Sequence, residues 1–82
     1  MVSSFDVRAF CHEPSLDKLV DQTISKDQWK FIALNFDIEY ASSSSKEQIK
    51  NIVIETLTAR GLLPDSAIDE LTPMSRTLIT RE

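Results

Sequence analysis

The sequence predicts an all-α fold, a single small domain of four short helices. The chain has 82 residues and one glycine, whereas average usage would give about six glycines, so turn-rich β structure is disfavoured. Apolar residues recur at spacings of three and four positions along most of the chain, as on one side of a helix. With a single cysteine, no disulfide within the chain can reinforce the core. The fold must therefore rest on helix packing.

The first helix is expected to begin near Ser3 or Ser4, with Asp6 in its first turn, and to end before Pro14. Its apolar side is formed by Val7, Phe10 and Cys11. A short second helix should start at Pro14 or Ser15, because proline suits the first position of a helix. The apolar side of this second helix comprises Leu16, Leu19, Val20 and Thr23.

The third helix has a clear start, because Ser25 followed by Gln28 has the spacing of a capping box. Apolar residues then occupy two sides of this helix. One side carries Trp29, Ile32, Ala33 and Phe36, and the other carries Phe31, Leu34 and Ile38. A helix that is apolar on two sides needs neighbours on both. We therefore expect it to lie centrally, between the fourth helix and the first two.

The fourth helix should begin at Ser44 or Ser45, since either serine has a glutamate or glutamine three residues later. It should end at Arg60, with Gly61 as a left-handed cap. Its core side is formed by Ile49, Ile52, Val53, Thr56 and Leu57. Leu62 and Leu63 can then fold back onto the core.

The pattern weakens after Pro64. Residues 66–71 can form one or two further helical turns, which Pro73 ends. We therefore place a single domain at 1–71 and expect a flexible tail at 72–82.

Residues 24–63 combine a short helix, an extended loop without glycine and a second helix with a lysine near its start. This arrangement resembles the helix-extended loop-helix class, which contains SAP domains, LEM domains and the N-terminal domain of transcription termination factor Rho. The resemblance implies a SAP-like core at 24–63. Lys46 matches the basic residue that SAP domains often carry at the start of the second helix. The apolar core positions implied are Ile24, Trp29, Ile32, Ile38, Ile49 and Leu57.

The chain departs from SAP domains in its loop. They commonly carry glycine after the first helix and again in the loop, where this chain has Asp37 and a serine run at 42–45. Aspartate tolerates the left-handed backbone region, so the fold is compatible with Asp37, but a close approach of the loop to DNA is disfavoured. The segments FDVRAF and PSLDKL ahead of this core also resemble the opening region of gag-like proteins from vertebrate, especially fish, retroelements.

Side chains that could act as a nucleophile or as a base in catalysis are scarce in this chain. Cys11 and His12 are the single pair of nucleophile and base types, and adjacent helical residues point about 100° apart. No further cysteine or histidine is present to complete a zinc site. We therefore predict a protein that is not an enzyme and uses no metal or cofactor.

The start of the fourth helix is the candidate nucleic-acid site. Helix N-termini bind phosphate, and the candidate contact residues are Ser44, Ser45, Lys46 and Lys50. Two lysines neutralise at most about two phosphates. Because the chain has 13 acidic and 9 basic residues and a net charge of −4, DNA or RNA binding is predicted to be weak and is the alternative function.

Two apolar residues are candidates for a protein-binding surface. Ile54 lies about 140° around its helix from Ile49, and Leu34 is placed similarly on its own helix. They either pack beneath the N-terminal helices or form an exposed patch for a partner. Trp29 could in principle stack on nucleic-acid bases, but its helical spacing favours the core.

The preferred function is a non-enzymatic interaction module that docks to a protein or self-associates within a larger protein. No apolar run approaches the ~18 residues of a membrane span, and the N-terminus lacks the pattern of a signal peptide. We therefore expect an intracellular protein, nuclear or cytoplasmic, that does not contact membranes.

Overall fold

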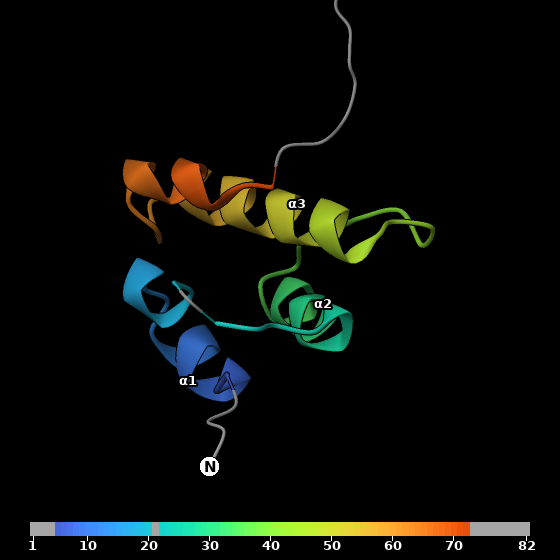
Figure 1. Ribbon diagram of the computed structural model, residues 1–82, viewed down its shortest axis with the longest axis horizontal. Coiled ribbons are helices and arrows are strands. Elements are labelled where there is room, and N and C mark those ends of the chain that lie inside the picture. Colours follow the sequence, from blue (N-terminus) through green and yellow to red (C-terminus); the bar gives the residue numbers. More distant parts are fainter. Residues whose placement is uncertain (1–4, 21, 73–82) are drawn as a thin grey trace, which may run out of the picture.

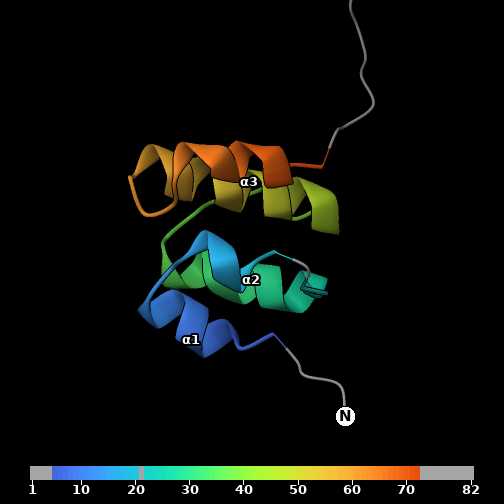
Figure 2. The ribbon, with the colours of Figure 1, turned by 60° about the vertical axis from the view of Figure 1, so that its left-hand side comes forward.

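The computed structural model describes residues 5–20 and 22–72 (Figure 1). It contains three α-helices, α1 (Val7–His12), α2 (Lys26–Asn35) and α3 (Lys46–Ala59), and two 3₁₀-helices, η1 (Leu16–Lys18) and η2 (Asp65–Glu70). No strand occurs in these residues, which confirms the all-α prediction. The helices form layers in which α2 lies between α1 and α3, and η2 runs back along α3 (Figure 2).

Helix α1 begins later than predicted. Asp6 is the residue before the helix, and its carboxylate accepts a hydrogen bond from the backbone N–H of Ala9 at 3.0 Å. Aspartate is among the best residues for this role, so it fixes the start at Val7 and does not lie in the first turn. Ser3 and Ser4 are outside the described residues.

The predicted second helix is reduced to the 3₁₀ turn η1. Ser15 precedes it without a side-chain capping bond, and an α-helix this short is costly to nucleate. Leu19 is buried, whereas Val20 and Thr23 are exposed. The expected apolar side therefore reaches the core mainly through Leu19.

Helix α2 starts at the predicted capping box. The Gln28 N–H donates to the Ser25 hydroxyl at 3.2 Å, and the Ser25 N–H donates to Gln28 Oε1 at 2.9 Å. Gln28 Nε2 also donates to the backbone oxygen of Phe5 at 3.3 Å, which ties the N-terminal segment to this helix.

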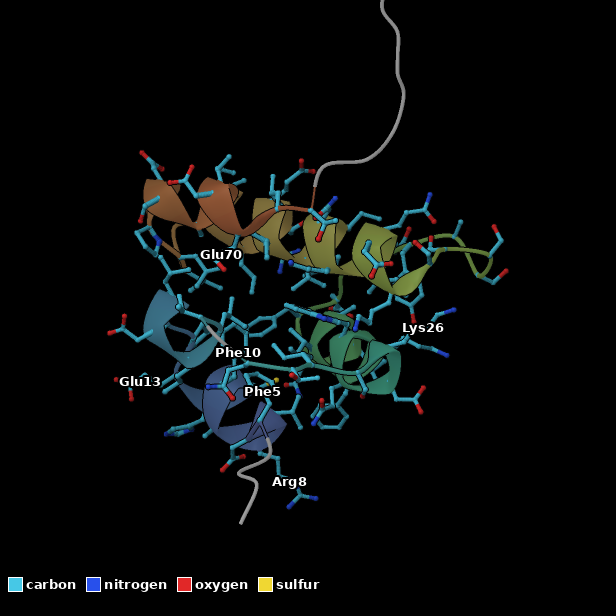
Figure 3. All side chains as sticks on the ribbon, in the orientation of Figure 1. Phe5, Arg8, Phe10, Glu13, Lys26 and Glu70 are labelled. Carbon is cyan, nitrogen blue, oxygen red and sulfur yellow. The ribbon has the colours of Figure 1, made fainter. Side chains whose placement is uncertain are left out.

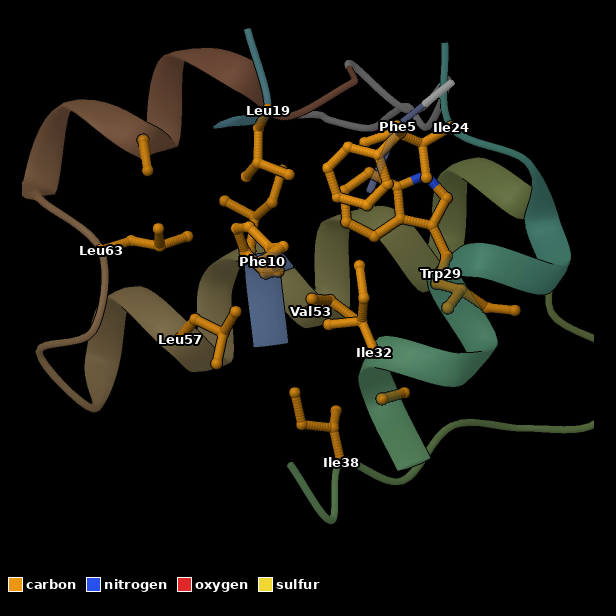
Figure 4. Packing of buried hydrophobic residues seen from close by; sticks show 14 residues of the cluster. Phe5, Phe10, Leu19, Ile24, Trp29, Ile32, Ile38, Val53, Leu57 and Leu63 are labelled. Atoms are coloured by element: carbon orange, nitrogen blue, oxygen red, sulfur yellow. The ribbon is translucent and has the colours of Figure 1, made fainter. Parts of the chain in front are cut away.

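The second apolar side of α2 is not covered as predicted. Leu34 is 75% exposed and Phe31 is 39% exposed, although Ile38 is buried. Phe5 and Phe10 join the buried cluster that contains Trp29 (Figure 4). The central position of α2 is thus confirmed, but the prediction that the N-terminal segment covers Phe31 and Leu34 is wrong.

A left-handed turn ends α2. Asp37 has φ 57°, its N–H donates to the Leu34 oxygen at 3.3 Å, and the Ile38 N–H donates to the Ala33 oxygen at 2.8 Å. These two bonds form a Schellman motif. The motif returns Ile38 to the core and confirms that an aspartate can occupy this position.

Of the two predicted starts of α3, the structure selects Ser45. Its hydroxyl accepts from the Gln48 N–H at 3.2 Å, and its own N–H donates to Gln48 Oε1 at 2.7 Å. Ser44 is buried, and its N–H donates to the Ala41 oxygen at 2.9 Å. The fully buried side chains of α3 are Ile49, Val53, Ile54 and Leu57.

Helix α3 ends at Ala59, one residue before the predicted end, and has the predicted left-handed cap. Gly61 adopts φ 79°, and the Leu62 N–H donates to the Leu57 oxygen at 2.9 Å, as in a second Schellman motif. Leu63 then packs into the core, but Leu62 stays partly exposed.

The chain remains fixed as far as Thr72. Asn51 Nδ2 donates to the Thr72 oxygen, and the Thr72 N–H donates to Asn51 Oδ1, both at 2.8 Å. The side chain of Asn51 thus joins residue 72, the first residue of the predicted tail, to α3. Pro73 and the remainder of the predicted tail lie outside the described residues.

One buried cluster holds these elements together (Figure 4), and it includes all six core positions that the SAP-like resemblance implies. Its members are Phe5, Phe10, Leu19, Ile24, Trp29, Ile32, Ala33, Ile38, Ile49, Val53, Ile54, Leu57, Leu63 and Ala67. Among the described residues, no helix has the length and apolar character needed to cross a membrane.

Candidate functional site

A groove of about 260 Å³ lies between the segment that leads into α2, the first half of α3 and the end of η2. Its apolar lining consists of Leu19, Ile24, Trp29 and Ile54. Its polar lining consists of Gln22, Thr23, Lys46, Lys50 and Glu70. Figure 3 shows Glu70 on the inner side of η2, which faces the layers of α1 and α2.

Helix α3 supplies one face of this groove. Lys46, Lys50 and Ile54 are spaced four residues apart, so they lie along one side of the helix. Ile54 is only 1% exposed, which confirms that it packs in the core and contradicts its assignment to an exposed patch. The groove therefore combines two ammonium groups with an apolar base.

The two lysines differ in their partners. Lys50 Nζ donates to the Thr72 hydroxyl at 3.0 Å. The ammonium group of Lys46 forms no hydrogen bond or ion pair with any residue that the structure describes. Within residues 5–20 and 22–72, the single ion pair joins Lys18 Nζ to Glu13 Oε1 at 3.7 Å. In these ranges, Glu70 therefore forms no ion pair with Lys46 or Lys50. The ammonium group of Lys46 is accordingly available to an anionic ligand.

The serines of the predicted anion site do not join these lysines in the groove. Ser44 is only 7% exposed. The hydroxyl and N–H of Ser45 are both engaged with Gln48. Of the four predicted contact residues, Lys46 and Lys50 alone line the groove.

Trp29 is a core residue, as its helical spacing predicts. It is 3% exposed, and its ring forms part of the base of the groove. A stacking platform needs an exposed ring face, so Trp29 is not available to nucleic-acid bases in this structure.

Leu34 lies on a different surface from the groove. It borders an open depression of about 280 Å³ together with Ala33, Asp37, Ile38 and Glu39. Leu34 and Ile54 therefore do not form the common exposed patch that their positions suggested. The carboxylates of Asp37 and Glu39 beside Leu34 are a feature that sequence reasoning missed, because Glu39 follows the turn at Asp37 and lies off the helix.

The chain's cysteine, Cys11, is partly buried. Burial raises the pKa of the Cys11 thiol, which makes the nucleophilic thiolate rarer at neutral pH. His12, the neighbouring residue, is exposed. Within residues 5–20 and 22–72, no three acidic, histidine or cysteine side chains gather in a way that could hold a metal ion.

Sequence reasoning also missed Asn51 and Glu70. Asn51 bonds a residue 21 positions away, so no local pattern indicates its partner. The one available signal was an asparagine inside a predicted helix, where this residue type is disfavoured unless its side chain has another role.

Comparisons of this chain with protein-family models, with curated proteins and with solved structures found no match. The chemistry of the groove is therefore the basis for a functional argument. Its apolar floor is formed by Leu19, Ile24, Trp29 and Ile54, each 1–6% exposed, and the ammonium group of Lys46 at its side can meet an acidic group.

Proposed function

We propose that this protein is a non-enzymatic interaction module whose groove binds a short segment of a protein partner. The observation that carries the proposal is the convergence of Lys46 and Lys50 above an apolar base in one groove. The complementary ligand is a bulky apolar side chain next to an acidic side chain. The SAP-like and gag-like resemblances are compatible with such a role and remain part of the proposal.

The size of the groove supports a peptide ligand. Its volume of about 260 Å³ lies below the 300–1,000 Å³ typical of small-molecule and cofactor sites. One or two side chains are therefore a better match than a cofactor.

The expected affinity is low. Burial of one leucine-sized side chain contributes about 1.5–3 kcal/mol, and a solvent-exposed ion pair adds about 0–1 kcal/mol. The sum is at most about 4 kcal/mol, which corresponds to a dissociation constant of about 1 mM or weaker. Linkage of several such modules in one assembly would strengthen the interaction through effective concentration.

The test is an NMR titration with the blocked dipeptide acetyl-Leu-Glu-amide. We expect shifts of the Lys46 and Lys50 amides and of the Trp29 indole, with a dissociation constant near 1 mM. Acetyl-Leu-Gln-amide and acetyl-Ser-Glu-amide, which each lack one half of the ligand, should bind several-fold more weakly. Shifts that are equal for all three peptides, or absent from the groove, would contradict the proposal.

A matched pair of variants isolates the charge. Lys46→Glu should weaken binding, whereas Lys26→Glu should not. Lys46 and Lys26 are each the first residue of a helix that begins with a capping box, so both changes add an acidic group where the helix dipole favours it. Lys26 is exposed and does not line the groove (Figure 3).

Weak nucleic-acid binding is the second candidate, and the position of Lys46 and Lys50 on one side of α3 favours it. Two phosphate contacts predict a slope near −2 in log K against log salt and a dissociation constant of about 10⁻⁴ M or weaker at physiological salt. Glu70 in the groove and the net charge of −4 oppose a polyanion. Micromolar binding of duplex DNA that maps to residues 44–50 and is lost in Lys46→Glu would make this candidate the preferred one.

A further inference from the structure

We propose that the occupant of the groove is a second copy of this chain, which docks head to tail. Leu34 of one copy enters the groove of the next, and the carboxylates of Asp37 and Glu39 face Lys46 and Lys50. This inference rests on the proposed function, because it names the partner of the same groove. It is carried by two complementary surfaces on a single molecule.

The first surface is built around Leu34. At 75% exposure it is the most exposed large apolar side chain in the described residues. The charged residues that line the depression beside it are Asp37 and Glu39, both exposed and both acidic. This surface thus presents an apolar side chain together with acidic groups, which is the ligand chemistry that the groove selects.

The second surface, the groove, has the opposite predominant charge. Lys46 and Lys50 line it together with one carboxylate, that of Glu70. The Leu34 surface also has one opposite charge close by, because Lys30 lies one helical turn before Leu34 and is exposed. In a head-to-tail pairing, Glu70 in the groove of one copy has the opposite charge to Lys30 of the next copy, so these two residues can face each other.

Arg60 is the other basic residue close to the Leu34 surface. Its Nη1 atom donates to the backbone oxygen of Phe36 at 2.6 Å. The guanidinium is therefore held at the end of α2 and keeps its charge, so it is a second cation near the Leu34 surface, although in the described residues it forms no ion pair with Asp37.

The two surfaces are separate on the molecule, so one copy can use both. The groove includes Trp29 near the start of α2, and Leu34 is near its end. These two residues point about 140° apart around the helix. An interface between two different surfaces is heterologous, and it produces rings or open chains of copies instead of a closed two-fold dimer.

The contact should be weak for free domains. One leucine side chain and two exposed ion pairs give an expected dissociation constant near 1 mM. Association should decrease as salt rises, because the ion pairs are exposed to solvent. In a larger assembly that holds many copies, effective concentration would favour chain formation.

The experiment measures the mass of the full chain by sedimentation as a function of concentration. We expect the average mass to rise with concentration beyond that of a dimer and to fall when salt is added. Leu34→Lys, which alters the apolar side chain, should weaken self-association at least tenfold, and Lys46→Glu, which alters the groove, should weaken it several-fold. Both positions tolerate the change, since Leu34 is exposed and an acidic residue suits the start of α3.

Mixing these two variants decides the geometry. The Lys46→Glu copy retains its Leu34 surface, and the Leu34→Lys copy retains its groove, so an equimolar mixture should form dimers with the wild-type affinity and grow no further. A mixture that stays monomeric, although each variant is folded, would overturn the head-to-tail proposal. Lys26→Glu and Leu62→Lys are the controls, since these positions line neither surface, and both should associate like the wild type.

The failure of this inference can be distinguished from failure of the proposed function. A wild-type chain that remains monomeric at millimolar concentration, but still binds acetyl-Leu-Glu-amide in the groove, would refute self-docking and leave the interaction module intact. Failure of both measurements would refute both proposals.

Discussion

Replacement of Asn51 by alanine should release the chain at Thr72 without unfolding the domain. Asn51 forms two hydrogen bonds with the backbone of residue 72, each 2.8 Å long and partly buried. Few other contacts are expected to hold this end of the described chain, because Leu71 and Thr72 are only half-buried. The effect should therefore be local.

The size of the effect follows from these two bonds. A typical hydrogen bond contributes about 0.5–1.5 kcal/mol net, so their loss lowers the free energy of local opening by about 1–3 kcal/mol. Since 1.36 kcal/mol corresponds to a factor of ten, amide exchange at Thr72 should accelerate by about 5–150-fold.

Native-state hydrogen exchange followed by NMR measures this opening directly, because the Thr72 N–H is itself the donor to Asn51 Oδ1. Thr72→Ala is the matched control. It removes the hydroxyl that accepts from Lys50 but keeps both backbone bonds, so the amide of residue 72 should remain protected. Equal protection in the wild type and in Asn51→Ala would refute the reasoning.

Four further predictions concern the core and the turns. Trp29→Ala should destabilise the domain by about 3–5 kcal/mol, because the ring is 3% exposed. Urea denaturation followed by circular dichroism measures the free energy of unfolding. A wild-type fluorescence maximum at the wavelength of fully hydrated tryptophan would contradict the burial of Trp29. Deletion of residues 1–23 removes the buried Phe5, Phe10 and Leu19 and should leave an aggregating or molten fragment, so sharp, dispersed amide resonances with an unchanged melting temperature would argue against a role for this segment. Gly61→Ala should cost about 1–2 kcal/mol, because φ is 79°; no clash adds to this cost, since no atom lies within 4 Å of an added Cβ. Asp37→Gly, at φ 57°, should be nearly neutral or stabilising, and thermal melting followed by circular dichroism measures both changes.

The features that could be predicted from the sequence are those set by neighbouring residues. Both capping boxes join residues three positions apart, so Ser25 and Ser45 carry a readable signal. The left-handed cap at Gly61 is equally local, because few residues other than glycine adopt that backbone region without strain.

The coverage of α2 could not be predicted in the same way. Helical periodicity shows which residues share a side, but it does not show which neighbours cover that side. Phe31 and Leu34 have the spacing of core residues, yet the N-terminal segment packs against the Trp29 cluster instead.

The candidate site was predictable only in part. The spacing of Lys46 and Lys50 places them on one side of a helix from sequence alone. The groove they line also needs Leu19 and Glu70, which approach α3 from both ends of the described chain. That convergence depends on how the helices pack, which no local pattern encodes.

Gln28 connects two events in folding through a single amide group. Its oxygen accepts from Ser25 at the start of α2, while its nitrogen donates to Phe5, 23 residues earlier. The local bond joins residues three positions apart, and once formed it orients the nitrogen for the bond to Phe5. A glutamate here would still close the capping box, but it would present a carboxylate oxygen to the Phe5 carbonyl. Gln28→Glu would therefore keep the capping box that starts α2 but remove the hydrogen bond that docks the N-terminal segment, so the two steps could be measured separately.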